Sequence, residues 1–166
     1  RRLRAIRGHP LSRRVVESVG STLIQDAGRP GLSAWGVGPS GVFDRRAFRQ
    51  VNTLLGNPEY AAVIEHFGGP LSLLATREHA VVVSGALGPV TLDGVPASVG
   101  EVVIMPAHSI LRVGPAVVGL RFLIGVAGGI DVPAVVSSRS RDTLAELGPE
   151  PLHAGVKLPV GLSACV

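Results

Sequence analysis

Glycine and proline interrupt this chain every few residues, and the apolar runs that they separate are short. The sequence holds 22 glycines and 13 prolines among 166 residues. Because both residues favour turns and interrupt helices, the pattern indicates many short strands joined by tight turns. Strands are expected at residues 21–25, 63–67, 71–75, 80–84, 90–92, 102–105, 110–113 and 120–126. The segments between them rarely have room for a helix, so a mainly β fold, a barrel or a sandwich, is predicted.

One principal helix is predicted at about residues 44–55. Asp44 can cap its first turn, and the apolar residues that follow recur on one face. The sequence Gly-Asn-Pro at 56–58 is typical of a helix end. A second, shorter helical turn is expected at residues 142–147, where the Gly-Pro pair at 148–149 would end it.

The charge of the chain is unevenly distributed. The formal net charge is +4, but six of the 16 basic residues lie within the first 14, which hold no acid. No stripe of basic and aromatic residues follows them, so a nucleic-acid partner is not expected. We interpret residues 1–14 as a flexible basic arm and residues 15–166 as one β-barrel domain, because an apolar content of 46% is enough for one core.

The residues present argue against several classes of protein and site. The longest segments without a charge, 30–43 and 79–92, fall short of the roughly 18 to 20 residues that a membrane span needs, so no membrane partner is expected. Cys165 is the single cysteine and cannot form an internal disulfide, and no signal segment is recognisable, which favours a cytoplasmic protein. The five histidines lack the close pairing of metal ligands, so no metal site is predicted.

A glycine-rich segment precedes the predicted helix. Gly36, Gly38 and Gly41 match the G-x-G-x-x-G pattern of dinucleotide-binding folds. Such a fold also needs a strand leading into the loop and a parallel sheet, whereas Pro39 interrupts this loop, so a turn that leads into the helix is the favoured interpretation. Neither a P-loop nor a G-x-S-x-G motif is present, so the chain itself is not expected to grip ATP phosphates or to carry a nucleophilic serine.

Polar residues concentrate between positions 25 and 65, among glycines and apolar residues. Singly, each has a structural explanation: Asp26 and Arg29 could form a local ion pair, and asparagines could satisfy buried backbone or turns. Together, their guanidinium, amide and carboxylate groups could recognise a small amide or carboxylate in a single polar pocket. The predicted set is Gln25, Asp26, Arg29, Ser40, Asp44, Asn52, Asn57 and Glu65. His66 is expected to be a structural or surface residue.

Five segments carry a resemblance to a known family. They are the runs QDAGRPG at 25–31, GVGPSGVFD at 36–44, NTLLGNP at 52–58 with Glu65 behind it, GGIDVP at 128–133 and SRS at 138–140. In order and spacing they are similar to the N-terminal portion of a family of 5-oxoprolinase subunits, also called KipA or allophanate hydrolase subunit 2. The resemblance implies a cyclophilin-like β-barrel related to the carboxyltransferase domain of urea carboxylase, and a second lobe beyond this portion.

The resemblance also implies a function. Members act with a KipI-like partner and one further protein of the same enzyme in the ATP-dependent opening of 5-oxo-L-proline to L-glutamate, and the complex, not this portion, uses ATP; no biotin or metal is implied. Arg29 and Arg139 would pair with anionic oxygens, while Gln25, Asn52 and Asn57 would orient the amide. Asp26, Asp44 and Glu65 would order those groups or position water. The alternatives are a non-catalytic, KipA-like regulatory module and an enzyme component that handles urea, allophanate or another small amide.

Overall fold

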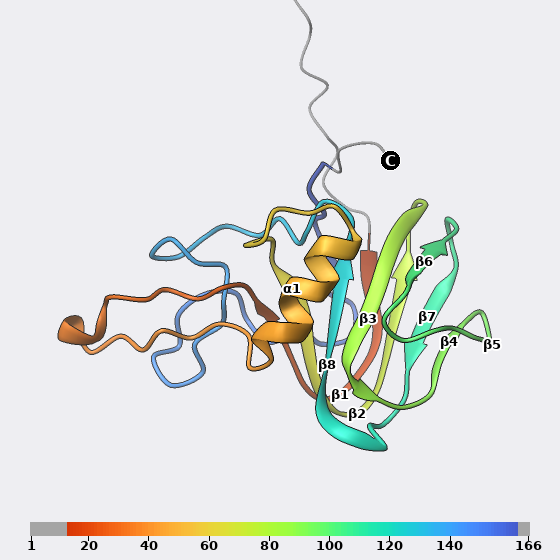
Figure 1. Cartoon of the computed structure of the whole chain (residues 1–166), viewed down its shortest axis with the longest axis horizontal. Helices are drawn as coiled ribbons and strands as arrows, with labels where there is room; N and C mark the ends of the chain where they lie inside the picture. The colour runs from red at the N-terminus through yellow and green to blue at the C-terminus, as the bar shows by residue number, and fades with distance from the viewer. Residues whose placement is uncertain (1–12, 163–166) are drawn as a thin grey trace, which may run out of the picture.

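The computed structural model describes residues 13–162, and a single curled sheet dominates them (Figure 1). Its strands are β1 (Arg13–Gln25), β2 (Val63–Ala75), β3 (His79–Leu87), β4 (Val90–Leu92), β5 (Val95–Pro96), β6 (Val102–Met105), β7 (Ile110–Val113), β8 (Val118–Val126) and β9 (Lys157–Leu158). The described residues also hold one α-helix, α1 (Arg45–Leu54), and a short 3-10 helix, η1 (Ser33–Trp35). The predicted mainly β fold with one principal helix is confirmed.

The sheet is organised around β2, the long strand that the two predicted segments 63–67 and 71–75 form together. One edge of β2 pairs with β1 in antiparallel fashion along most of its length. The other edge divides: residues 64–67 pair with β8, and residues 71–74 pair with β7. One branch continues from β8 to β3 and β6, the other from β7 to β4 and β5. Because one strand feeds two branches, the sheet curls round instead of extending flat.

Two glycines face each other where β2 divides. Gly20 of β1 is opposite Gly68 of β2, with φ angles of 104° and 123° that residues bearing a Cβ rarely adopt. A Cβ added to Gly20 would also collide with the carbonyl oxygen of Phe67. The glycine pair therefore lets both strands bend at the point where their partners change.

Apolar side chains cover both faces of the sheet. The inner face, enclosed by the curl, carries the larger cluster, which includes Ile64, Phe122 and Ile124. The helix α1 lies on the outer face (Figure 1). There Phe48 and Val51 of the helix pack onto Val63, Val82 and Leu123. Since residues alternate between faces along each strand, β2 and β8 supply side chains to both clusters.

The helix α1 begins and ends as its local sequence predicts. The Oδ1 atom of Asp44 accepts hydrogen bonds from the backbone N–H groups of Arg46 and Ala47, at 3.0 and 2.9 Å. The chain leaves the helix at Gly56, whose φ is 63°. Within residues 13–162 no helix has the length and apolar character of a membrane span.

Two predictions about chain segments need correction. Residues 142–147 form no helix; they make a turn closed by an antiparallel bridge between Asp142 and Leu147. The reason is that Glu146 has a φ of 53°, outside the helical region. Residues 1–12 of the predicted arm lie outside the described residues, but Arg13 and Arg14 belong to β1, because they pair with β2 and β9.

Candidate functional site

Three neighbouring strands present polar side chains on the outer face of the sheet. In the β1–β2 pair Leu23 is opposite Glu65, and in the β2–β8 pair Glu65 is opposite Leu123. Paired residues project to the same face and so do residues two apart, which places Gln25, Glu65 and Arg121 on one face. The helix α1 covers only part of this face, and the polar strip lies on the part that it leaves open.

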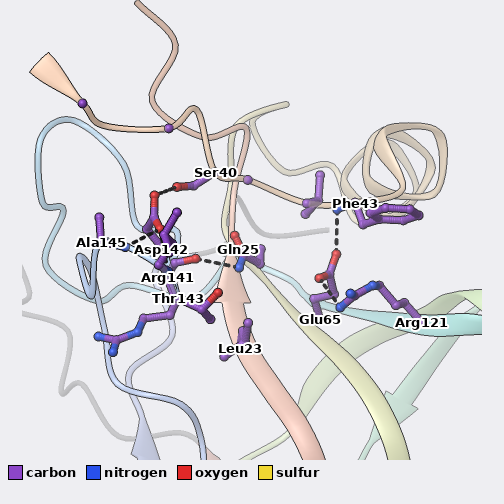
Figure 2. A pocket seen from close by; sticks show the side chains of 15 residues that line it. Leu23, Gln25, Ser40, Phe43, Glu65, Arg121, Arg141, Asp142, Thr143 and Ala145 are labelled. Carbon is purple, nitrogen blue, oxygen red and sulfur yellow. Dashed lines mark hydrogen bonds and ion pairs between the residues drawn. The ribbon is translucent and has the colours of Figure 1, made fainter. Parts of the chain in front are cut away.

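Two loops close over this strip and form a cleft of about 660 Å³ (Figure 2). One loop precedes α1, and the other includes the turn at residues 142–147. The residues that line the cleft are Leu23, Gln25, Gly36, Gly38, Ser40, Gly41, Val42, Phe43, Glu65, Arg121, Arg141, Asp142, Thr143, Leu144 and Ala145. Its walls are therefore drawn from segments that are far apart in the sequence.

An ion pair lies on one side of the cleft. The Nη1 atom of Arg121 is 3.1 Å from Oε1 of Glu65, and Oε2 of Glu65 accepts a hydrogen bond of 2.7 Å from the backbone N–H of Phe43. The guanidinium also lies against two aromatic rings, with its central carbon 5.3 Å from the ring centre of Phe43 and 5.5 Å from that of Phe67. Arg121 is thus held in place before any ligand arrives, although its side chain remains 34% exposed.

Gln25 lines the cleft and carries an unpaired acceptor. Its Nε2 atom donates to the backbone carbonyl of Arg141 at 3.0 Å. Its Oε1 atom is buried and accepts no hydrogen bond from any other group in the described part of the chain. A buried polar atom without a partner is uncommon and calls for a ligand, a water molecule or some other donor.

A hydrogen-bonded chain fixes the two loops to each other. The Oγ atom of Ser40 donates to Oδ2 of Asp142 at 2.8 Å, and Nη1 of Arg29 donates to Ser40 Oγ at 3.0 Å. Hydrogen bonds from the N–H of Ala145 and from Ser40 hold the pKa of Asp142 below its usual value. Arg29 itself is 2% exposed and lies behind the cleft wall, so its position indicates support of Ser40.

Asp26 anchors the segment 138–140, which leads into the second loop. Its carboxylate accepts hydrogen bonds of 2.6 Å from the hydroxyls of Ser138 and Ser140 and from the backbone N–H of Arg139. The Nη2 atom of Arg29 donates to the carbonyl oxygen of Ser140 at 2.6 Å. The predicted ion pair between Asp26 and Arg29 is therefore wrong: both residues instead bind the segment 138–140.

The remaining predicted site residues lie elsewhere. Asn52 donates to the carbonyl of Ala61, in the segment that leads from α1 to β2. Asn57 bridges the carbonyl of Val126 in β8 and the N–H of Gly128, and so fastens the end of the helix to the sheet. A further residue, Arg139, pairs with Asp131 at 3.0 Å beside a separate, smaller pocket.

The hypothesis of a single pocket is therefore wrong. Gln25, Ser40 and Glu65 meet in the cleft, with Arg29 and Asp26 behind it. Asn52, Asn57, Arg139 and the helix cap Asp44 do not line it. Contact of any of these side chains with a ligand stays a prediction.

Sequence reasoning missed three prominent residues of the cleft, Phe43, Arg121 and Asp142. A usable signal existed only for Arg121, which is the one charged residue in the otherwise apolar strand β8. His66, by contrast, is structural as expected. It is buried on the inner face, with its Nδ1 2.7 Å from Thr22 Oγ1 and its Nε2 2.7 Å from the carbonyl of Gly69. Burial lowers its pKa.

A comparison with protein families finds a match over most of the chain. Residues 35–165 match the family model described as "Carboxyltransferase domain, subdomain A and B". The chain belongs to this carboxyltransferase-domain family. The resemblance deduced from the sequence motifs is thereby confirmed.

Among individual relatives, a 5-oxoprolinase subunit of Escherichia coli is 33% identical over 145 residues, which cover 86% of this chain and 47% of that protein. Urea amidolyase of Saccharomyces cerevisiae is 36% identical over 129 residues, which cover 76% of this chain and 7% of that protein. The crystal structure of TTHA0988 superimposes with a TM-score of 0.90 at 28% identity, covering 98% of this chain and 33% of that one. The chain thus spans less than half the length of these relatives.

Proposed function

We propose that this chain forms part of an ATP-dependent 5-oxoprolinase, which opens 5-oxo-L-proline to L-glutamate, and that the cleft is its ligand site. The observation that carries the proposal is the buried, unpaired amide oxygen of Gln25, a residue that lines a polar cleft, within a chain similar to a 5-oxoprolinase subunit over 86% of its length. A lactam has an N–H group that such an acceptor can bind.

The contents of the cleft support a role beside partner proteins. Of the residues 13–162 that the structure describes, no histidine or cysteine lines the cleft, and the hydroxyl of Ser40 already donates to Asp142. A serine nucleophile needs a neighbouring base that accepts its proton and is itself oriented by a third group. The chain is therefore proposed to act with a KipI-like partner and one further protein of the same enzyme, in the cytoplasm, with the ATP used by the complex.

A second candidate function rests on a different relative. The 36% identity to urea amidolyase favours urea or another small amide as the alternative substrate. A non-catalytic, KipA-like module that regulates its partner is the remaining alternative, because the cleft has no self-sufficient catalytic group.

One assay separates these functions. The chain is co-purified with its KipI-like partner and the further protein of the enzyme, and release of phosphate from ATP is measured with 5-oxo-L-proline, with urea and with neither. We expect hydrolysis of ATP only with 5-oxo-L-proline, together with glutamate as product. Turnover with urea alone would support the second candidate, and stable assembly without any substrate-dependent turnover would support the regulator.

A further inference from the structure

We propose that Gln25 and Arg121 together select a small carboxylate that also carries an amide N–H. The protein covers Oε1 of Gln25 in the absence of a ligand. In the proposed complex a small shift of the covering cleft residues lets this oxygen accept the ligand's N–H, and the guanidinium of Arg121 binds the ligand's carboxylate. The inference rests on the proposed function of the cleft as a ligand site, and it defines the chemical class of that ligand. Two independent observations carry it, one for each residue.

The first observation is the fixed orientation of the Gln25 amide. Since Nε2 donates to the carbonyl of Arg141, turning the amide over would break that hydrogen bond and set Oε1 against another acceptor. The oxygen is thus held as an acceptor, and it is buried without a donor in the part of the chain that the structure describes. A ligand with an N–H group satisfies it, whereas a ligand without one leaves it unpaired, which is the basis of strong discrimination.

The second observation concerns which charged groups of the cleft are already occupied. Both oxygens of Glu65 accept hydrogen bonds from Arg121 and Phe43, and both oxygens of Asp142 accept from its own turn and from Ser40. The carboxylates of the cleft are therefore committed to the protein. Arg121 still has free donors. Its Nη1 atom donates to Glu65, and the side chain has no other hydrogen-bond partner within residues 13–162.

Arg121 is also well prepared to bind an anion. Its guanidinium lies against the rings of Phe43 and Phe67 and is paired with Glu65, so little side-chain freedom is lost when a ligand binds. The planar group can present two parallel N–H donors to a carboxylate. Glu65 offsets part of its charge but leaves most of its N–H groups available.

The two groups lie on either side of Glu65, as Figure 2 shows. Gln25 projects from β1, Glu65 from β2 and Arg121 from β8, all on the same face of the sheet. A ligand that satisfies both ends therefore needs its N–H and its carboxylate at separate positions. The class includes lactam acids such as 5-oxo-L-proline and carboxylated ureas such as allophanate. Neutral urea can engage only Gln25.

Binding of three ligands to the full chain, measured by isothermal titration calorimetry, tests the proposal without any mutation. They are 5-oxo-L-proline, its N-methyl derivative, which lacks the N–H, and 2-pyrrolidinone, which lacks the carboxylate. We expect each of the latter two to bind at least about tenfold more weakly, which is the scale of one lost hydrogen-bonded or ionic contact. Similar affinities for all three ligands would overturn the proposal.

Variants then assign each preference to its residue. Gln25→Met should remove the preference for N–H over N-methyl, and Arg121→Met should remove the preference for the carboxylate over 2-pyrrolidinone. The matched controls are Gln50→Met and Arg112→Met, which change an exposed glutamine and an exposed arginine outside the cleft and should leave both preferences intact. A variant that melts well below the wild type is replaced by Gln25→Leu, which should also remove the preference for N–H, or by Arg121→Lys, which should weaken the preference for the carboxylate.

The outcome is distinguishable from that of the proposed function. If the isolated chain binds none of the ligands, the titration is repeated on the complex with its partner proteins, and absence of discrimination there refutes the inference. Turnover of ATP dependent on 5-oxo-L-proline but indifferent to Gln25→Met and Arg121→Met would leave the function standing and remove the inference. If binding discriminates among the three ligands but no such turnover occurs, the inference about Gln25 and Arg121 stands and the proposed function falls.

Discussion

Two buried carboxylates illustrate how residues of one type serve different purposes in this molecule. Glu65 lies in the cleft and sets the position of Arg121, whereas Asp26 lies behind the cleft and ties the segment 138–140 to the end of β1. Burial is similar for both, with 4% and 7% of the residue exposed, so burial alone does not separate the two roles. The two roles are distinguished by the hydrogen-bond partners of each carboxylate.

Asp26 should be among the residues whose loss costs the most stability. Asp26→Ala leaves two hydroxyls and two backbone N–H groups without their acceptor, and we expect the free energy of unfolding to fall by about 2–4 kcal/mol. Urea denaturation measures the change. As a control, Asp131→Ala removes an exposed ion pair with Arg139 and should cost less than about 1 kcal/mol. Equal losses for both variants would contradict the role given to Asp26.

His79 should make the fold sensitive to mild acid. Burial, with Arg13 and Arg77 nearby, lowers the pKa of His79 from 6.5 to about 4. In the range between these two values the unfolded chain binds the proton and the folded chain does not, so stability is lost as the pH falls from 6.5 towards 4. Burial lowers the pKa of His66 as well, and it acts in the same direction.

The free energy of unfolding, measured by urea denaturation between pH 4 and pH 8, checks this expectation. The loss of stability in acid should be smaller in His79→Gln than in the wild type. An unchanged slope in the variant would show that His79 does not carry the effect.

At the scale of elements, a helix or turn was predicted correctly where the residues that determine it are neighbours in the sequence. The cap, the apolar face and the glycine stop of α1 all lie within residues 44–56, and the helix forms where they predict it. The turn at 142–147 was predicted wrongly because its form depends on partners elsewhere: the Asp142 side chain accepts the N–H groups of its own turn and also binds Ser40. The helix propensity of residues 142–147 contains no information about a contact with Ser40, which lies about a hundred positions away.

The contact between α1 and the sheet depends on one glycine. A Cβ placed on Gly125 of β8 would collide with the side chain of Val51 in α1. We expect Gly125→Ala to destabilise the protein by about 1–3 kcal/mol through overpacking. Adding Val51→Ala should make the combined loss smaller than the sum of the two single losses, because the two side chains compete for the same space. Strictly additive losses in thermal or chemical denaturation would rule out this contact as the cause.

At the scale of the whole molecule, the cleft is a product of strand register. Sequence reasoning identified Gln25, Ser40 and Glu65, which lie in the polar segment that it singled out. It missed Arg121: the single charge in an apolar strand marked this residue as unusual, but only the pairing of β2 with β8 places it on the same face as Glu65. Likewise, the second loop reaches the cleft through contacts that join residues about a hundred positions apart.

The same long-range pairing should set the speed of folding. β1 must find β2, and β2 must find β8, before either pair gains its hydrogen bonds. Folds dominated by such contacts refold on the order of milliseconds to seconds. Stopped-flow refolding of the urea-unfolded chain, followed by far-ultraviolet circular dichroism, should fall in this range. Loss of the whole refolding signal within the mixing dead time would contradict it.

Successive side chains of strand β2 point to opposite faces of the sheet. Ile64 and His66 point into the inner cluster, while Glu65 between them points into the cleft. An insertion or deletion of a single codon in this stretch would turn every following side chain to the opposite face, placing a carboxylate among apolar side chains and isoleucine in water. Natural homologues can therefore be expected to vary in length at the surface loops, such as the one carrying η1, and to keep the spacing of 63–67 unchanged.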